Sequence, residues 1–124
     1  MFLFLVVSNI QKDKNDKLYF GRSHNYGSLY SYGVAEIYIS SDSIMTRYDY
    51  TLPNKKEWKN YKNYPAHKEV NKISKREKFY CLINPQNGLE NETHYIRITN
   101  KKLTYYYKDS ENNFIKGYTF IRKE

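Results

Sequence analysis

Cysteine and histidine are scarce in this chain of 124 residues, which has one cysteine and three histidines. Because Cys81 has no second cysteine to pair with, no internal disulfide can form, and packing alone must hold the fold. No two histidines stand three or four residues apart, and one cysteine cannot build a structural zinc site. The sequence therefore predicts neither a metal site nor a bound cofactor. Cys81 lies in an apolar run, where burial raises a thiol pKa, so we expect no nucleophilic role.

Glycine and proline are also few, at five and three residues, so the chain is not of low complexity. The glycines at 21, 27 and 33 fit neither the P-loop nor the dinucleotide fingerprint, and no Gly-x-Ser-x-Gly turn is present. We therefore do not expect an enzyme. One enzymatic alternative stays open, a metal-independent ribonuclease with a histidine acid and base and a cation for the phosphate. Its candidate residues are His24, His94, Arg22 and Arg97.

Long hydrophobic runs are missing as well. The apolar run at residues 2–7 is far too short to span a bilayer. No Lys or Arg precedes this run and no small-residue cleavage pattern follows it, so we predict that residues 2–10 form a buried strand. This interpretation favours a cytoplasmic location. The alternative is that residues 1–10 are the remnant of a secretory signal, which would place the protein outside the cytoplasm.

Aromatic residues, in contrast, are abundant, with 15 tyrosines and 6 phenylalanines. Aromatic residues favour strands, and tyrosine suits positions where the ring is buried and the hydroxyl meets water. Within residues 43–52, apolar and aromatic side chains alternate with Arg47, Asp49 and Thr51, which is the period of a strand with one wet face. Further strands are predicted at residues 2–10, 18–21, 34–40, 78–84, 93–99, 102–108 and 114–121.

Short polar turns separate most of the predicted strands, so sequential strands are expected to pair antiparallel. We predict a single domain over residues 1–124 that is mainly β. It would be one antiparallel barrel or a two-layer sheet of seven or eight strands. The three-glycine segment at residues 21–33 is expected to form an irregular aromatic loop.

Residues 54–77 differ from the rest and predict a short basic helical insert. Asn54 and Glu57 have the spacing of a capping box at the start of a helix. Ala66, Val70 and Ile73 stand at i, i+4 and i+7, which predicts one apolar stripe of a second helix. Proline at position 65 suits the first turn of that helix.

Most of the positive charge also falls in this insert. Nine Lys and Arg residues against three Glu residues give residues 54–78 a net charge of +6, out of +8 for the chain. Such a surface attracts acidic proteins and nucleic acids, and aromatic side chains between the lysines can stack on bases. Trp58 and Tyr61, at i and i+3, have the alternative role of anchoring the helix. The candidate partner-binding residues are Lys55, Lys56, Trp58, Lys59, Tyr61, Lys62, Lys68, Lys72, Lys75 and Arg76.

The end of the chain, "KLTYYYKDSENNFIKGYTFIRKE" at residues 102–124, resembles the end of small bacterial lipocalin-like domains. Those domains close with a Leu-x-Tyr strand, an Asp- and Asn-rich turn, a Tyr-x-Phe strand and a basic finish. The resemblance implies an antiparallel barrel with a ligand mouth at one end. It implies no catalytic residues, and the helical insert departs from the usual pattern of these domains.

These observations lead us to expect a non-enzymatic binding protein. The basic aromatic insert would dock an acidic protein partner, in an inhibitor or immunity-type role. One alternative is a lipocalin-like barrel that binds a small apolar ligand, with residues 21–33 near its mouth. Another is a small basic ribonuclease or nucleic-acid-binding protein. Because lysine dominates over arginine in the insert, sequence-specific recognition of nucleic acid is not expected.

Overall fold

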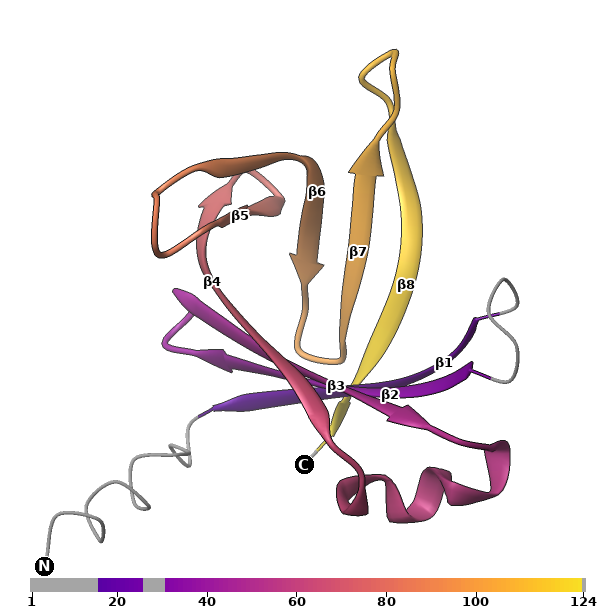
Figure 1. Ribbon diagram of the computed structural model, residues 1–124. Coiled ribbons are helices and arrows are strands. Elements are labelled where there is room, and N and C mark those ends of the chain that lie inside the picture. Colours follow the sequence, from indigo (N-terminus) through magenta and orange to yellow (C-terminus); the bar gives the residue numbers. More distant parts are fainter. Residues whose placement is uncertain (1–15, 26–30, 124) are drawn as a thin grey trace, which may run out of the picture.

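The computed structural model describes residues 16–25 and 31–123. Within these ranges the chain forms eight antiparallel strands that close into a barrel (Figure 1). Each strand pairs with the next in sequence, and β8 closes the barrel against β1. The strands are β1 (Lys17–Asn25), β2 (Ser31–Ser40), β3 (Ile44–Leu52), β4 (Ala66–Arg76), β5 (Phe79–Ile83), β6 (Glu90–Ile98), β7 (Lys102–Lys108) and β8 (Phe114–Lys123).

The mainly β, antiparallel prediction is confirmed, and of the two predicted architectures the barrel is the one found. A barrel is also what the lipocalin-like resemblance implies at the coarse level. The strand predicted at residues 2–10 lies outside the described residues. The loop predicted at 21–33 is shorter than expected, because β1 continues to Asn25 and β2 begins at Ser31.

Side chains of the barrel wall alternate between an inner face and an outer face, as successive residues of a strand must. On β2, Ala35, Ile37 and Ile39 point into the core, while Glu36 and Tyr38 point outward. The inner face is filled by a packed cluster of buried side chains from all eight strands. Its members are Tyr19, Ala35, Ile37, Ile39, Met45, Ile73, Leu82, Ile96, Leu103 and Phe120.

The barrel wall consists of two parts whose strands run in different directions, and β4 belongs to both parts. In Figure 1, β1, β2 and β3 run across the lower part of the barrel, with β6, β7 and β8 standing above them. The first part of β4, Ala66–Lys72, pairs with β3, whereas pairing with β5 begins only at Lys72. The closing contact between β1 and β8 is also short, at Leu18–Phe20 against Ile121–Lys123.

One helix interrupts the described strands, a 3-10 helix η1 at Lys55–Asn63 between β3 and β4. This confirms the first half of the predicted insert. The second predicted helix is wrong, because Ala66–Arg76 forms β4. The spacing of Ala66, Val70 and Ile73 fits a helical stripe, but β-branched residues also suit strands, and pairing along β3 decides the outcome. No helix in the described part of the chain has the length and apolarity needed to cross a membrane.

Replacing Gly21 by alanine should destabilise the barrel, because the inner face of β1 lies against the ring of Phe120. A Cβ at position 21 would stand 2.8 Å from Cε2 of that ring, so the ring or the strand must shift. We expect Gly21→Ala to lower the free energy of unfolding by about 1–3 kcal/mol, measured by urea denaturation. The double variant Gly21→Ala with Phe120→Leu should recover part of the loss. Stability equal to wild type in the single variant would contradict this packing.

Candidate partner-binding surface

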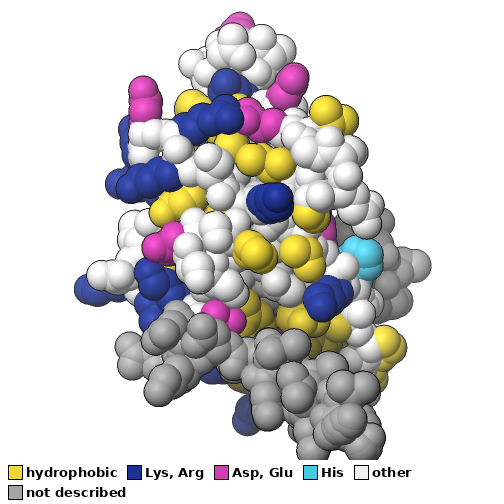
Figure 2. Space-filling view, turned by 90° about the vertical axis from the view of Figure 1, so that its left-hand side faces the viewer, with side chains coloured by type: hydrophobic (Ala, Val, Ile, Leu, Met, Phe, Trp, Pro, Cys, Tyr) yellow, Lys and Arg dark blue, Asp and Glu magenta, His cyan; other side chains and the backbone are white. Residues whose placement is uncertain are grey.

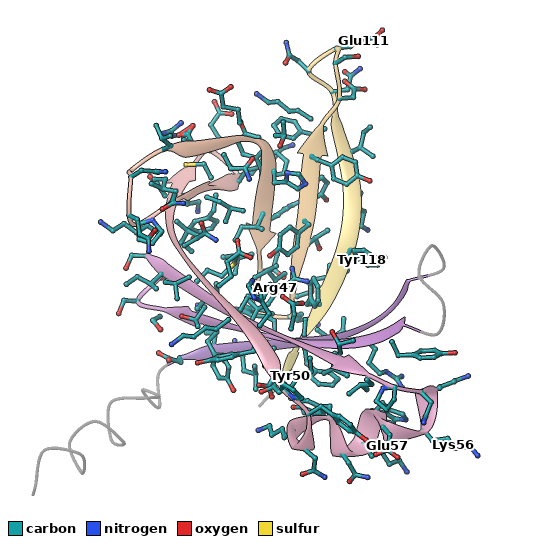
Figure 3. All side chains as sticks on the ribbon, in the orientation of Figure 1. Arg47, Tyr50, Lys56, Glu57, Glu111 and Tyr118 are labelled. Atoms are coloured by element: carbon teal, nitrogen blue, oxygen red, sulfur yellow. The ribbon has the colours of Figure 1, made fainter. Side chains whose placement is uncertain are left out.

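The helix η1 folds back onto the outer face of β2 and β3, opposite the barrel core. Its first turn is capped by Asn54, whose side-chain oxygen accepts a hydrogen bond from the Lys56 amide at 3.0 Å. The capping box is only half formed. Glu57 does not reach back to Asn54, and its carboxylate instead accepts from the hydroxyl of Tyr64 at 3.0 Å. Figure 3 shows Lys56 and Glu57 on η1, below the strands.

A buried carboxylate, Glu36 on β2, holds η1 in place. Glu36 is 3% exposed, and the hydroxyl of Tyr61 on η1 donates to its Oε2 atom. Tyr50 on β3 donates to Oε1 at 3.3 Å, and Tyr38 on β2 donates to the same atom at 3.5 Å. The Lys62 ammonium lies 3.6 Å from Oε2. An uncompensated charge at this depth would be costly, so these donors make the burial of Glu36 tolerable.

The contacts of Tyr61 therefore fit the alternative role predicted for it, an anchor of the helix. Its ring packs against Tyr50 at 4.9 Å and Phe20 at 5.6 Å between ring centroids. Glu36 was missed by the sequence analysis. The signal that could have identified Glu36 is its position as the one charged residue in the apolar segment 34–40, with the same strand parity as Tyr38.

This environment raises the pKa of the tyrosines around Glu36. Burial is the main cause at Tyr61, followed by the hydrogen bond to the carboxylate and its negative charge. Burial and the charge of Glu36 raise the pKa of Tyr38 to about 12. The pKa of Tyr50 is raised by the same two causes. All three hydroxyls therefore stay protonated, and keep donating, well above neutral pH.

Beside η1 lies a groove of about 920 Å³ on the outside of the barrel wall. Trp58, half-buried, forms one side of it, and the guanidinium of Arg22 on β1 stacks over the Trp58 ring at 4.2 Å from the centroid. Arg22 was singled out from the sequence only as a nuclease candidate, because nothing placed β1 beside η1. The described lining residues are Phe20, Gly21, Arg22, Tyr32, Gly33, Leu52, Lys55, Trp58, Thr119 and Ile121.

The candidate cations of β4 do not all lie on one face of the strand. Lys68 and Lys72 lie on the outer face, in register with Tyr48 and Ile44 of β3. Lys75 has the opposite strand parity and lies on the other face of β4. Lys68 extends toward Tyr48, with its ammonium 5.8 Å from the ring centroid.

Ion pairs divide the predicted cations into two groups. Arg76 is paired with Glu90 at 2.7 Å, and Lys62 is paired with Glu36. Among the residues that the structure describes, no carboxylate pairs with the remaining cations of η1, with Arg22 or with the outer cations of β4. We call these residues, together with Trp58, the basic surface. Its members are Arg22, Lys55, Lys56, Trp58, Lys59, Lys68 and Lys72.

Hydrophobic side chains elsewhere on the molecule are also bordered by cations. On the face that Figure 2 presents, Lys and Arg side chains stand among hydrophobic ones. At the far end of the barrel, the stacked rings of Phe79 and Phe114 have their centroids 4.4 Å apart. The ammonium of Lys108 lies 5.5 Å from the Phe114 ring. Aromatic rings with nearby cations are thus a general feature of this chain, and the groove beside Trp58 distinguishes the basic surface.

The residues of the nuclease alternative are not assembled by the described structure. Arg22 is on β1, whereas His94 and Arg97 are on β6, and β7 and β8 separate these strands in the barrel. The side chain of His24 lies outside what the structure describes. The Nδ1 atom of His94 is 2.8 Å from the Thr93 hydroxyl.

Cys81 is buried in β5, and burial raises the pKa of its thiol, as expected from the sequence. Its sulfur donates to the carbonyl of Ser74 at 3.4 Å. Over residues 16–25 and 31–123, no group of three His, Cys, Asp or Glu side chains is arranged to hold a metal ion. The basic surface is therefore the strongest candidate site in the described structure.

Comparisons of the chain with protein-family models, with curated proteins and with solved structures found no match.

Removing the hydroxyl of Tyr61 should destabilise the protein, because the carboxylate of Glu36 loses a donor that water cannot replace. We expect Tyr61→Phe to cost about 1.5–3 kcal/mol, the range for hydrogen bonds to charged groups. Urea denaturation followed by circular dichroism measures this change. The matched control is Tyr64→Phe, which removes a partly buried bond to Glu57, a carboxylate far less buried than Glu36, and should lower the midpoint less. Equal midpoints for the two variants would contradict the anchoring role.

Stability should fall at alkaline pH. The pKa values of Tyr38, Tyr50 and Tyr61 are raised in the folded state above about 10, the value for an exposed tyrosine. Their contribution is therefore complete below pH 10 and is lost as the pH rises toward 12. Urea unfolding between pH 8 and pH 12 measures the loss, and Glu36→Gln should reduce it. Identical pH profiles for the two proteins would show that Glu36 does not govern these hydroxyls.

Proposed function

We propose that this protein is a non-enzymatic binding protein that docks an acidic protein partner through the basic surface, in an inhibitor or immunity-type role. The observation that supports this proposal most is the set of cations without carboxylate partners among the described residues. Lys55, Lys56 and Lys59 are exposed on η1, and Lys68 and Lys72 are exposed on β4. Such charges steer an acidic partner and form ion pairs with it on docking.

Trp58 and Arg22 would form the centre of this interface. Tryptophan and arginine are the residues that most often contribute large shares of binding free energy, particularly when they sit together in a depression. The stacking of Arg22 on Trp58 holds the guanidinium in one orientation, so less side-chain entropy is lost on binding. A carboxylate from the partner would accept both hydrogen bonds from one edge of that guanidinium.

The groove favours a second candidate function, the binding of a small apolar ligand. Phe20, Leu52, Trp58 and Ile121 contribute apolar or aromatic surface to it. Its volume lies within the usual range for small-molecule sites. This groove is on the outside of the barrel wall, whereas the inner face is occupied by the packed core. A ligand here would therefore bind differently from the barrel-mouth mode that the lipocalin-like resemblance implies.

Charge reversal tests the proposed function, with the sole tryptophan, Trp58, as the reporter. Poly-L-glutamate should change the fluorescence of Trp58 in low salt, and Lys55→Glu with Lys59→Glu and Lys68→Glu should weaken its binding at least roughly tenfold. The control is the reversal of Lys75, Lys101 and Lys116, which lie outside the basic surface and should leave affinity within about twofold. Higher salt should weaken binding, because exposed charges are screened.

The competing candidates give different results in the same titration. A single-stranded oligonucleotide of equal charge that binds more tightly than poly-L-glutamate would favour the nucleic-acid alternative. An uncharged amphiphile whose binding survives the charge reversal would favour the small-ligand alternative. The absence of binding by poly-L-glutamate would contradict the proposed function.

A further inference from the structure

We propose that the first part of β4, at Ala66–Val70, is an open strand edge that receives an extended acidic segment of the partner by strand addition. This inference rests on the proposed function and specifies how the partner binds. In strand addition, main-chain hydrogen bonds supply affinity, and alternate side chains supply specificity.

The edge is open because β4 serves two parts of the barrel in succession. Residues Ala66–Lys72 pair with β3 on one side, and β5 pairs with β4 only from Lys72 onward. In Figure 1, β4 leaves η1, runs along β3 and reaches β5 only in its upper part. All residues of Ala66–Val70 are exposed. Among the described residues, therefore, no strand occupies the second side of this segment.

The direction of one hydrogen bond shows which backbone groups of this segment point away from β3. The amide of Ile73 donates to the carbonyl of Ser43 at 2.9 Å, so the backbone groups of Ile73 point toward β3. Backbone groups in an antiparallel strand alternate in direction from residue to residue. His67, Glu69 and Asn71 therefore also point toward β3. The N–H and C=O groups of Ala66, Lys68 and Val70 point away from β3, toward the open side.

The side chains beside this edge define the chemistry of the segment. Lys68 and Lys72 lie on the outer face, with Val70 between them, and Val70 is 37% exposed. Ile44, in register with Lys72 on β3, is 40% exposed. An added strand along Ala66–Val70 would therefore place a carboxylate directly beside Lys68 and another near Lys72, where pairing with β5 begins.

The other face of the same segment carries no excess of positive charge. Glu69 is in register with Arg47 on β3, and His67 is in register with Asp49. On that face Arg47 is paired with Asp49 of its own strand at 2.9 Å, and Glu69 accepts a hydrogen bond from the Asn71 side chain at 3.3 Å. The uncompensated charge at this edge is therefore positive and lies on the outer face, which selects an acidic segment.

A second copy of this chain is a poor occupant. Antiparallel pairing of two β4 edges about Lys68 would set Lys68 against Lys68 of the other copy. Pairing about Val70 would set Lys68 against Lys72, whose second side β5 already occupies. Like charges directly opposite are destabilising, and lysines at an edge are one way in which proteins prevent pairing between identical edges. The same lysines attract a segment of opposite charge.

Amide hydrogen exchange of the full-length protein, followed by NMR, tests this inference. The probe is a capped decapeptide of alternating glutamate and threonine, at millimolar concentration. In the protein alone, the amides of Lys68 and Val70 should exchange quickly, whereas those of His67 and Glu69 should exchange slowly. With the peptide, exchange at Lys68 and Val70 should slow at least roughly tenfold, because these amides become hydrogen-bonded.

A matched peptide separates strand addition from charge attraction. The same decapeptide with N-methylated glutamates has identical charge but lacks the N–H groups that would donate to the carbonyls of Lys68 and Val70, and its methyl groups would keep the two strands apart. It should not slow exchange at these amides. On the protein, Val70→Pro removes an outward N–H without removing a bond to β3, and proline is tolerated at edges. This variant should bind the unmethylated peptide at least roughly tenfold more weakly, whereas Val70→Thr should bind it within about threefold.

The outcomes distinguish this inference from the proposed function. If poly-L-glutamate binds the basic surface but neither acidic peptide slows exchange at Lys68 and Val70, the strand-addition inference is wrong and the proposed function stands. Equal slowing by the methylated peptide would also overturn the inference. Slow exchange that depends on protein concentration without peptide would assign the edge to a second copy. Failure of poly-L-glutamate to bind would overturn the proposed function itself.

Discussion

The buried carboxylate of Glu36 is the constraint on which the arrangement of the outer face depends. A charge removed from water must be matched by donors, and here the donors come from separate elements: Tyr38 from β2, Tyr50 from β3 and Tyr61 from η1. Because Tyr61 and Lys62 both contact this carboxylate, η1 cannot lift from the sheet without removing a hydrogen-bond donor and a cation from a buried charge. The helix is short and has no fully buried residue of its own, so this polar contact and the packing of Tyr61 fix its position.

A fixed η1 has consequences for binding. Trp58 is held beside β1, where Arg22 stacks on its ring, and Trp58 and Lys55 both line the groove. The cations of η1 therefore form a surface of defined geometry. Preorganised charges lose less entropy when a partner docks than charges on a mobile loop, so a modest number of lysines can discriminate between partners. The same short helix thus contributes Tyr61 to the buried cluster around Glu36 and its lysines to the basic surface.

The period-two pattern of residues 43–52 predicted β3, where Tyr48 and Tyr50 alternate with Arg47 and Asp49. The face expected to be wet is the inner one, because Arg47 lies over the ring of Phe120 in the core. The second helix failed for a physical reason. Ala66, Val70 and Ile73 fit a helical spacing, yet only Ile73 becomes buried, and the strand partner that decides the conformation is distant in sequence from the helix pattern. The site was predicted in part. Lysines could be located from sequence, whereas their partners, Glu36 for Lys62 and Glu90 for Arg76, depend on which strands become neighbours.

The crossing of the two parts of the barrel explains why an open edge and a positive surface occur together. A strand that passes from one part to the other can have a partner on both sides only over part of its length. On β4 the unpartnered part is the one nearest η1, so Lys68 is at once an edge residue and a member of the basic surface. A charge that prevents pairing between identical edges also selects the sign of any segment that does pair there. Topology therefore fixes where a partner strand fits, and the lysines fix what it must carry.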